Sequence, residues 1–163
     1  MIISRLVAFV GLFVLFSTGA HAQLRVERAS IDQFKAQSTK FDVLTRQAFA
    51  STTNSTNAND ITLSFSLAHE ATRMRDRLRD LEVFLSLYSV FPRPPSINPE
   101  LDGAVRKLLT VQLDELTAHT KRSLRLIDGM TTKAEDKTLV FMIRQVRDEL
   151  KATDQLISQL ATQ

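Results

Sequence analysis

The stretch LAHEATRMRDRLRDLEVFLSLY, residues 67–88, decides the fold of this 163-residue chain. Its apolar residues recur alternately four and three positions apart, at Leu67, Ala71, Met74, Leu78, Leu81, Leu85 and Tyr88. Because an α-helix turns once in about 3.6 residues, this spacing places all seven side chains along one face. We therefore predict an amphipathic helix over residues 61–91, with Asn59 or Asp60 as its N-cap.

Helical spacing of apolar residues also marks three further segments. The first is residues 30–50, which opens on a capping-box pattern of Ser30 with Gln33. Residues 99–128 follow Asn98, with proline at the first helical position, and end at Gly129 as a C-cap. Residues 133–161 open on a second capping box, Thr132 with Glu135.

The predicted core-facing residues of these three helices follow the same rule. They are Ile31, Phe34, Phe41, Leu44 and Ala48 in the first; Leu101, Val105, Leu109, Leu113, Leu116, Leu124 and Ile127 in the next; and Leu139, Ile143, Val146, Leu150, Thr153, Ile157 and Leu160 in the last. Residues 51–60 are polar and predict a loop, and four prolines between residues 92 and 99 predict an extended connector. Since no strand pattern competes, we expect an all-α, antiparallel up-down four-helix bundle.

The N-terminus has the layout of a secretory signal peptide. Arg5 precedes an apolar run from Leu6 to Phe16, and Ala20-His21-Ala22 fits the small-x-small rule for signal peptidase. As a helix the run is only ~17 Å long, against ~30 Å for a hydrocarbon core, so we predict cleavage rather than anchoring. We expect a signal peptide over residues 1–22, a single domain over residues 23–163, and no stable membrane insertion after cleavage.

Composition narrows the function classes. With no cysteine in the chain, disulfides, cysteine-ligated metals, c-type haem, thiol catalysis and a lipoprotein anchor are all excluded. An exported chain of this size without disulfides is more typical of a bacterial periplasm or extracellular space. The formal net charge is only +3, and the arginines of residues 73–80 alternate with acids at i,i+3 spacing, so we predict no nucleic-acid partner.

Helical bundles commonly hold metal or haem sites, for which histidines are the first candidates. His119 falls on the apolar side of its predicted helix, whereas His69 lies opposite its seam, so the two imidazoles cannot share an ion. Glu115 with His119 is a single i,i+4 pair, and Met74 with His119 could hold a haem, but neither pattern is specific. We predict no metal or cofactor.

Several common catalytic motifs are missing from the sequence. No nucleophile elbow, Ser-x-x-Lys, His-Glu-x-x-His or Gly-rich phosphate loop occurs. We therefore predict no catalytic residues and no enzyme activity.

A difference in helix length suggests where a partner could bind. The first predicted helix spans ~30 Å and the other three ~45 Å, so one end of the bundle would lack a fourth wall. The apolar patch expected there consists of Phe84, Leu87, Val90, Phe91, Ile97, Leu101, Leu156 and Leu160. The alternative is that residues 24–30 extend the first helix and close the gap.

The sequence thus predicts a non-enzymatic exported protein that acts through an interface, either with itself or with another envelope protein. The interface would be the open end or a secondary row on the second helix that includes Ile61, Phe65, Val83 and Val90. A small-ligand or metal/haem-binding bundle is the first alternative, and an enzyme of unmarked type is the second.

Overall fold

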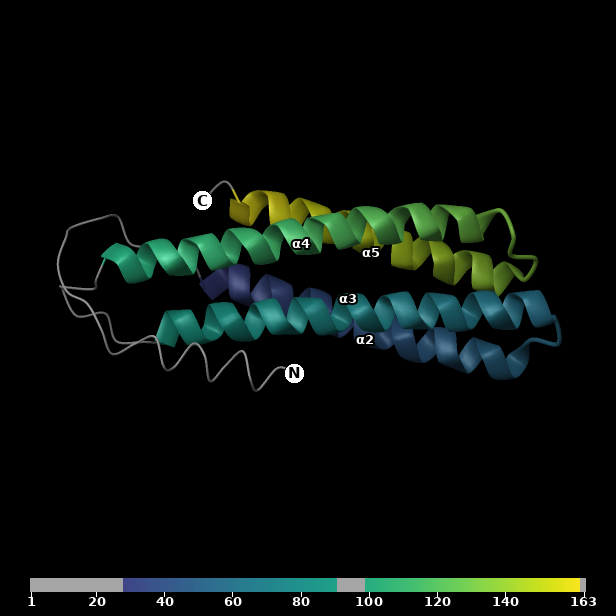
Figure 1. Cartoon of the computed structure of the whole chain (residues 1–163). Coiled ribbons are helices and arrows are strands. Elements are labelled where there is room, and N and C mark those ends of the chain that lie inside the picture. The colour runs from purple at the N-terminus through teal and green to yellow at the C-terminus, as the bar shows by residue number, and fades with distance from the viewer. Residues whose placement is uncertain (1–27, 91–98, 162–163) are drawn as a thin grey trace. The chain divides into compact units, whose positions relative to one another are not determined.

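The computed structural model describes residues 28–90 and 99–161, and all but the linkers between them are helical. The helices are α2 (Arg28–Asn54), α3 (Ala58–Val90), α4 (Pro99–Thr131) and α5 (Lys137–Ala161), shown in Figure 1. Within the described ranges there is no strand, so the all-α prediction is confirmed. The predicted signal peptide, residues 1–22, and residues 92–98 of the predicted proline connector lie outside these ranges.

The chain divides into two compact units. One unit comprises residues 25–91 and 110–163, and the other comprises residues 1–24 and 92–109. The first unit contains α2, α3, α5 and the greater part of α4. Of the second unit the structure describes only the first part of α4, residues 99–109, which is helical throughout.

The α2 helix extends four residues further than the sequence predicted. Ser51, Thr52 and Thr53 belong to its last turn, and each hydroxyl donates a hydrogen bond to the carbonyl oxygen three residues earlier, at 2.7, 2.7 and 2.8 Å. The polar side chains that favour loops here satisfy the carbonyls at a helix end instead. The predicted loop of ten residues is therefore reduced to residues 55–57.

The N-cap of α3 is Asn57 and not Asn59 or Asp60. The Oδ1 atom of Asn57 accepts hydrogen bonds from the backbone N–H groups of Asn59, at 2.8 Å, and Asp60, at 3.4 Å. These are the second and third helical positions, which an N-cap side chain normally satisfies. The carboxylate of Asp60 is thereby free to bind elsewhere.

The boundary between α4 and α5 also differs from the prediction. The α4 helix continues through Gly129 to Thr131, and Gly129 does not have the left-handed backbone of a C-cap. The predicted Thr132–Glu135 capping box is wrong, because the Thr132 hydroxyl donates to the Gly129 carbonyl instead. The N-cap of α5 is Asp136, whose Oδ1 accepts a hydrogen bond of 2.8 Å from Leu139 N.

The predicted apolar faces form the core. On α3 every predicted seam residue from Leu67 to Leu85 is buried, and only Tyr88 is partly exposed. All seven predicted residues on α5 and all five on α2 are buried. On α4 Leu124 is the exception among the described residues, being partly exposed, while the side chain of Leu101 is not described.

Polar side chains link neighbouring helices at their margins. Between α2 and α3, Ser51 pairs with Ser64 and Ser38 bonds to the carbonyl of Arg75, so the two helices run antiparallel. The α2 helix also contacts α5, where the Nε2 of Gln37 donates to the carbonyl and carboxylate of Glu149 at 2.9 and 2.8 Å.

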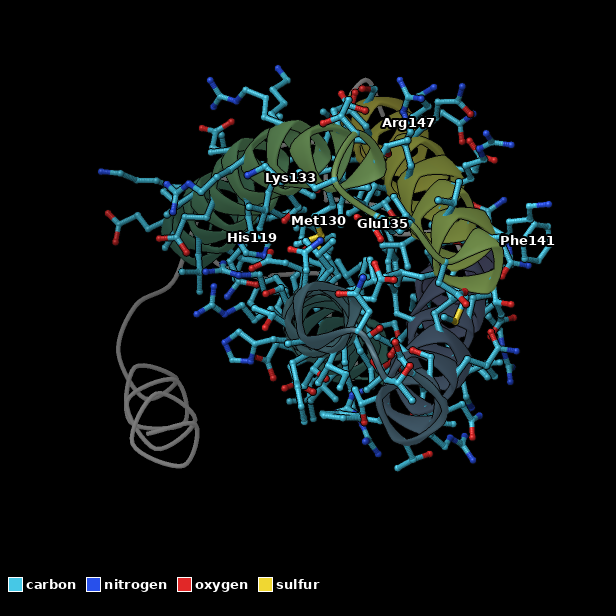
Figure 2. All side chains as sticks on the ribbon, turned by 90° about the vertical axis from the view of Figure 1, so that its right-hand side faces the viewer. His119, Met130, Lys133, Glu135, Phe141 and Arg147 are labelled. Atoms are coloured by element: carbon cyan, nitrogen blue, oxygen red, sulfur yellow. The ribbon has the colours of Figure 1, made fainter. Side chains whose placement is uncertain are left out.

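The α4 helix has a polar link with each of two neighbours. Ser123 donates to Glu70 on α3, and Arg147 on α5 lies 2.9 Å from Asp128. Figure 2, which looks along the helices, shows buried Met130 directed between them and exposed Phe141 directed away.

A buried carboxylate near the start of α3 binds the linker between α4 and α5. Asp60, which is 2% exposed, accepts hydrogen bonds from the backbone N–H groups of Glu135 and Asp136, both at 3.1 Å. Two amides support the same junction: Asn57 donates to the Glu135 carboxylate and Asn59 donates to the Lys133 carbonyl. The start of α3 is therefore tied to the chain between α4 and α5.

We expect Asp60→Ala to lower the free energy of unfolding by about 2 kcal/mol, because it leaves two backbone donors without their partner. Urea denaturation of the variant and of the unchanged chain measures the difference. Asp148→Ala is the matched control, since Asp148 is an exposed aspartate on α5, and we expect its effect to stay within about 0.5 kcal/mol. Equal stability of the two variants would show that the junction contributes nothing.

Candidate functional site

The predicted apolar patch is described only in part. Leu87 is exposed, Phe84 and Leu156 are partly exposed, and Leu160 is buried. Phe91 and Ile97, and the side chains of Val90 and Leu101, lie outside what the structure describes. The patch therefore stays a prediction.

The structure brings together an exposed aromatic pair that the sequence did not predict. Phe49 on α2 and Phe65 on α3 are 46% and 51% exposed. Their rings are 6.1 Å apart between centroids and inclined at 75°, an edge-to-face arrangement. Such a pair presents a large apolar surface to solvent on the outer side of the α2–α3 hairpin.

Phe65 belongs to the predicted secondary row on α3, whereas Phe49 belongs to no predicted surface. Val83 of this row is exposed and Ile61 is partly exposed. The signal for Phe49 was its place directly after Ala48, outside the core series of its helix. Periodicity alone cannot show that it meets a phenylalanine on another helix.

Charged residues of both signs are paired elsewhere on the same two helices. Asp42 on α2 forms ion pairs with Arg46 on its own helix and with Arg75 on α3, the latter at 3.1 Å. Hydrogen bonds from Arg46 and Arg75 hold the pKa of the Asp42 carboxyl below its ordinary value. The α2–α3 hairpin thus carries both signs of charge as well as the aromatic pair.

The two histidines of the described ranges lie as predicted. His119 is only 8% exposed, whereas His69 is exposed. Figure 2 shows His119 on the side of α4 that faces α3. Glu115, the acid predicted to accompany His119, is exposed. In the part of the chain that the structure describes, no three His, Cys, Asp or Glu side chains gather as a metal site would require.

The buried acid beside His119 is Glu70, which the sequence pattern did not single out. Its carboxylate accepts a hydrogen bond of 2.9 Å from the Ser123 hydroxyl and one of 3.1 Å from Arg73. Both Glu70 and Ser123 are buried where α3 and α4 meet. A signal was present: Glu70 follows Leu67 by three residues and precedes Met74 by four, so it borders the apolar seam.

The imidazole of His119 has an unsatisfied nitrogen. Its Nε2 atom is buried and has no hydrogen-bond partner within residues 28–90 and 99–161. Burial and the positive charges of Arg77, Arg73 and Arg122 lower the pKa of His119, and the carboxylate of Glu70 only partly opposes them. The neutral imidazole is therefore the form that this environment favours.

Ser123, His119 and Glu70 include the residue types of a hydrolytic triad but not its geometry. In a triad the serine hydroxyl is hydrogen-bonded to the imidazole, which is held in turn by the acid. Here the hydroxyl of Ser123 donates directly to Glu70, and the Nε2 of His119 bonds to no residue in the part of the chain that the structure describes. The cluster is best described as a buried polar contact between two helices.

Comparison with protein-family models, with curated proteins and with solved structures gives no match to the chain. Among the helices that the structure describes, none combines the length and the apolar character needed to cross a membrane.

We expect Glu70→Ala to destabilise the protein by about 1–3 kcal/mol, because it leaves the buried Ser123 hydroxyl without an acceptor. Glu70→Gln keeps an acceptor and should cost less, since the Arg73 partner that it loses is largely solvated. Thermal or urea unfolding measures both values, with Glu115→Ala as the exposed control. A Glu70→Ala effect no larger than that of Glu115→Ala would contradict a structural role for this acid.

Proposed function

We propose that this chain is an exported, non-enzymatic helical protein that acts through a protein–protein interface. The observation that carries the proposal is the exposed Phe49–Phe65 pair. Aromatic side chains at the centre of an interface supply much of its binding energy, and polar residues usually surround them. The same hairpin also carries polar residues, among them the ion pairs of Asp42 with Arg46 and Arg75.

The partner that we propose is a second copy of the chain. A twofold axis through the aromatic pair would place apolar surface against the same surface of the other copy. The hairpin carries acidic and basic residues together, so two copies would not meet the repulsion that a surface of one sign would produce. Binding of another envelope protein is the alternative outcome.

The proposal includes the direction of the four helices and the removal of a signal peptide. The four helices would alternate in direction as an up-down bundle, which is supported by the polar links of α2 with α3 and α5, and of α4 with α3 and α5. Residues 1–22 would be removed on export, leaving a chain of residues 23–163 in a periplasm or the extracellular space. The Ala20-His21-Ala22 pattern and the lack of cysteine support this localisation.

A ligand- or metal-binding bundle is the second candidate, and one observation favours it. The unpartnered Nε2 of His119 lies in the interior beside a buried carboxylate. A metal assay and a visible absorption spectrum of the protein from its native host test this candidate. A stoichiometric ion or a haem band that is lost in His119→Leu would replace our proposal.

We expect a native mass spectrum of the protein, purified from its host's exported fraction, to show a multiple of the mass of residues 23–163. Added mass equal to another protein would point to a hetero-complex. A small increment would indicate a ligand. A monomer with nothing attached, at every accessible concentration, would contradict the proposal.

The variant Phe49→Ser/Phe65→Ser should weaken self-association by about 30-fold or more, the effect expected when central aromatic residues are removed. Sedimentation at several concentrations measures the dissociation constant. Phe141→Ser is the matched control, because Phe141 is 59% exposed on α5 and has no ring partner among the described residues. If Phe141→Ser weakened self-association equally, this would contradict a place for the Phe49–Phe65 pair in the interface.

A further inference from the structure

We propose that the contact between α3 and α4 is sensitive to acid, because proton uptake by His119 loosens α4 from α3. This acid-sensitive contact is independent of the proposed interface. It depends on where His119 lies, on what its ring bonds to, and on which charges surround it.

The position of His119 makes its charged form difficult to accommodate. The side chain is 8% exposed, and its Nε2 atom is out of contact with solvent and has no hydrogen-bond partner among the described residues. A protonated imidazole donates from both ring nitrogens, so it would leave a buried, charged donor unsatisfied. Burying a charge without a partner is among the most unfavourable changes that a folded protein can undergo.

The surrounding charges add to this effect. Those that act most strongly on His119 are Arg77, Arg73 and Glu70 on α3, and Arg122 on α4 itself; α2 and α5 contribute none of the four. Three positive groups therefore oppose a fourth positive charge, and one carboxylate favours it. That carboxylate is already engaged by Ser123 and Arg73. Together with burial, these groups hold the pKa of His119 below its ordinary value.

The direction of the pH dependence follows from this shift. When α4 is separated from α3, His119 is solvated and takes up a proton near pH 6.5, the ordinary value. In the closed state the same proton binds only at lower pH. Stability is therefore complete above about pH 6.5 and decreases as the pH falls toward the lowered pKa, because the open state binds more protons over that range. One proton changes the opening equilibrium by at most about tenfold per pH unit.

The opening should be confined to the α3–α4 contact at first. The nearest described links elsewhere, Gln37 with Glu149 and Ser51 with Ser64, contain no histidine and connect α2 with its own neighbours. On α3, by contrast, fully buried Met74 lies one turn from Glu70. Separation of α4 would expose this apolar surface.

The first experiment is hydrogen–deuterium exchange of the chain at pH 7.5 and pH 5.0, corrected for the intrinsic pH dependence of exchange. We expect protection in residues 112–127 of α4 to decrease by between about fivefold and thirtyfold at the lower pH, while residues 38–51 of α2 change less. His119→Met replaces the imidazole by an uncharged side chain and should abolish the difference. His69→Gln, which removes an exposed histidine from α3, should retain it.

Unchanged protection in α4 at pH 5.0, or the same loss in His119→Met, would overturn the proposal. If His119→Met fails to fold, a proton NMR titration of the unchanged chain tests the proposal instead. The His119 ring, identified by its buried environment and slow exchange, should then titrate below pH 6.5. Titration of His119 at or above pH 6.5 would contradict the proposed acid sensitivity of the α3–α4 contact.

Discussion

Burial of the apolar seam of α3 is the constraint on which the other helices depend. Six of its residues, from Leu67 to Leu85, are almost completely removed from solvent. Five core-facing residues of α2 and seven of α5 are buried as well. Each large apolar side chain contributes about 1.5–3 kcal/mol when it is fully buried. With no cysteine in the chain, no disulfide supplements this contribution. The helices must therefore stay packed for any of them to persist.

Polar residues determine how the packed helices end and meet. Asp60 is buried at the start of α3, yet both of its oxygens are satisfied by the linker between α4 and α5. Because an apolar core has no preferred register of its own, directional bonds of this kind favour one alignment over others. The polar links of Gln37 with Glu149 and of Ser123 with Glu70 have the same effect further along the helices.

The aromatic pair and the buried histidine differ in how they relate to this core. Phe49 and Phe65 lie outside it and are exposed, so their apolar surface is accessible without any change in the fold. His119 lies within it, and a change in its charge acts on the contact between two helices. The first site is suited to binding a partner and the second to responding to acidity. Both are built from residues on different helices, brought together by the same packing.

The sequence by itself determined the helical class, the core-facing residues and the opposite exposures of His69 and His119, because all of these follow from the 3.6-residue period of a helix. It could not locate the helix ends: the side chains of residues 51–53 can bond either to a loop or to a helix end, and Gly129 is compatible with both. The structure located the N-cap of α3 at Asn57. The tertiary arrangement alone decided that Asp60 binds the linker between α4 and α5, that Glu70 meets Ser123 and that Phe49 meets Phe65. Each of these three contacts joins segments far apart in the sequence, and periodicity within one helix does not show which segment will lie beside it.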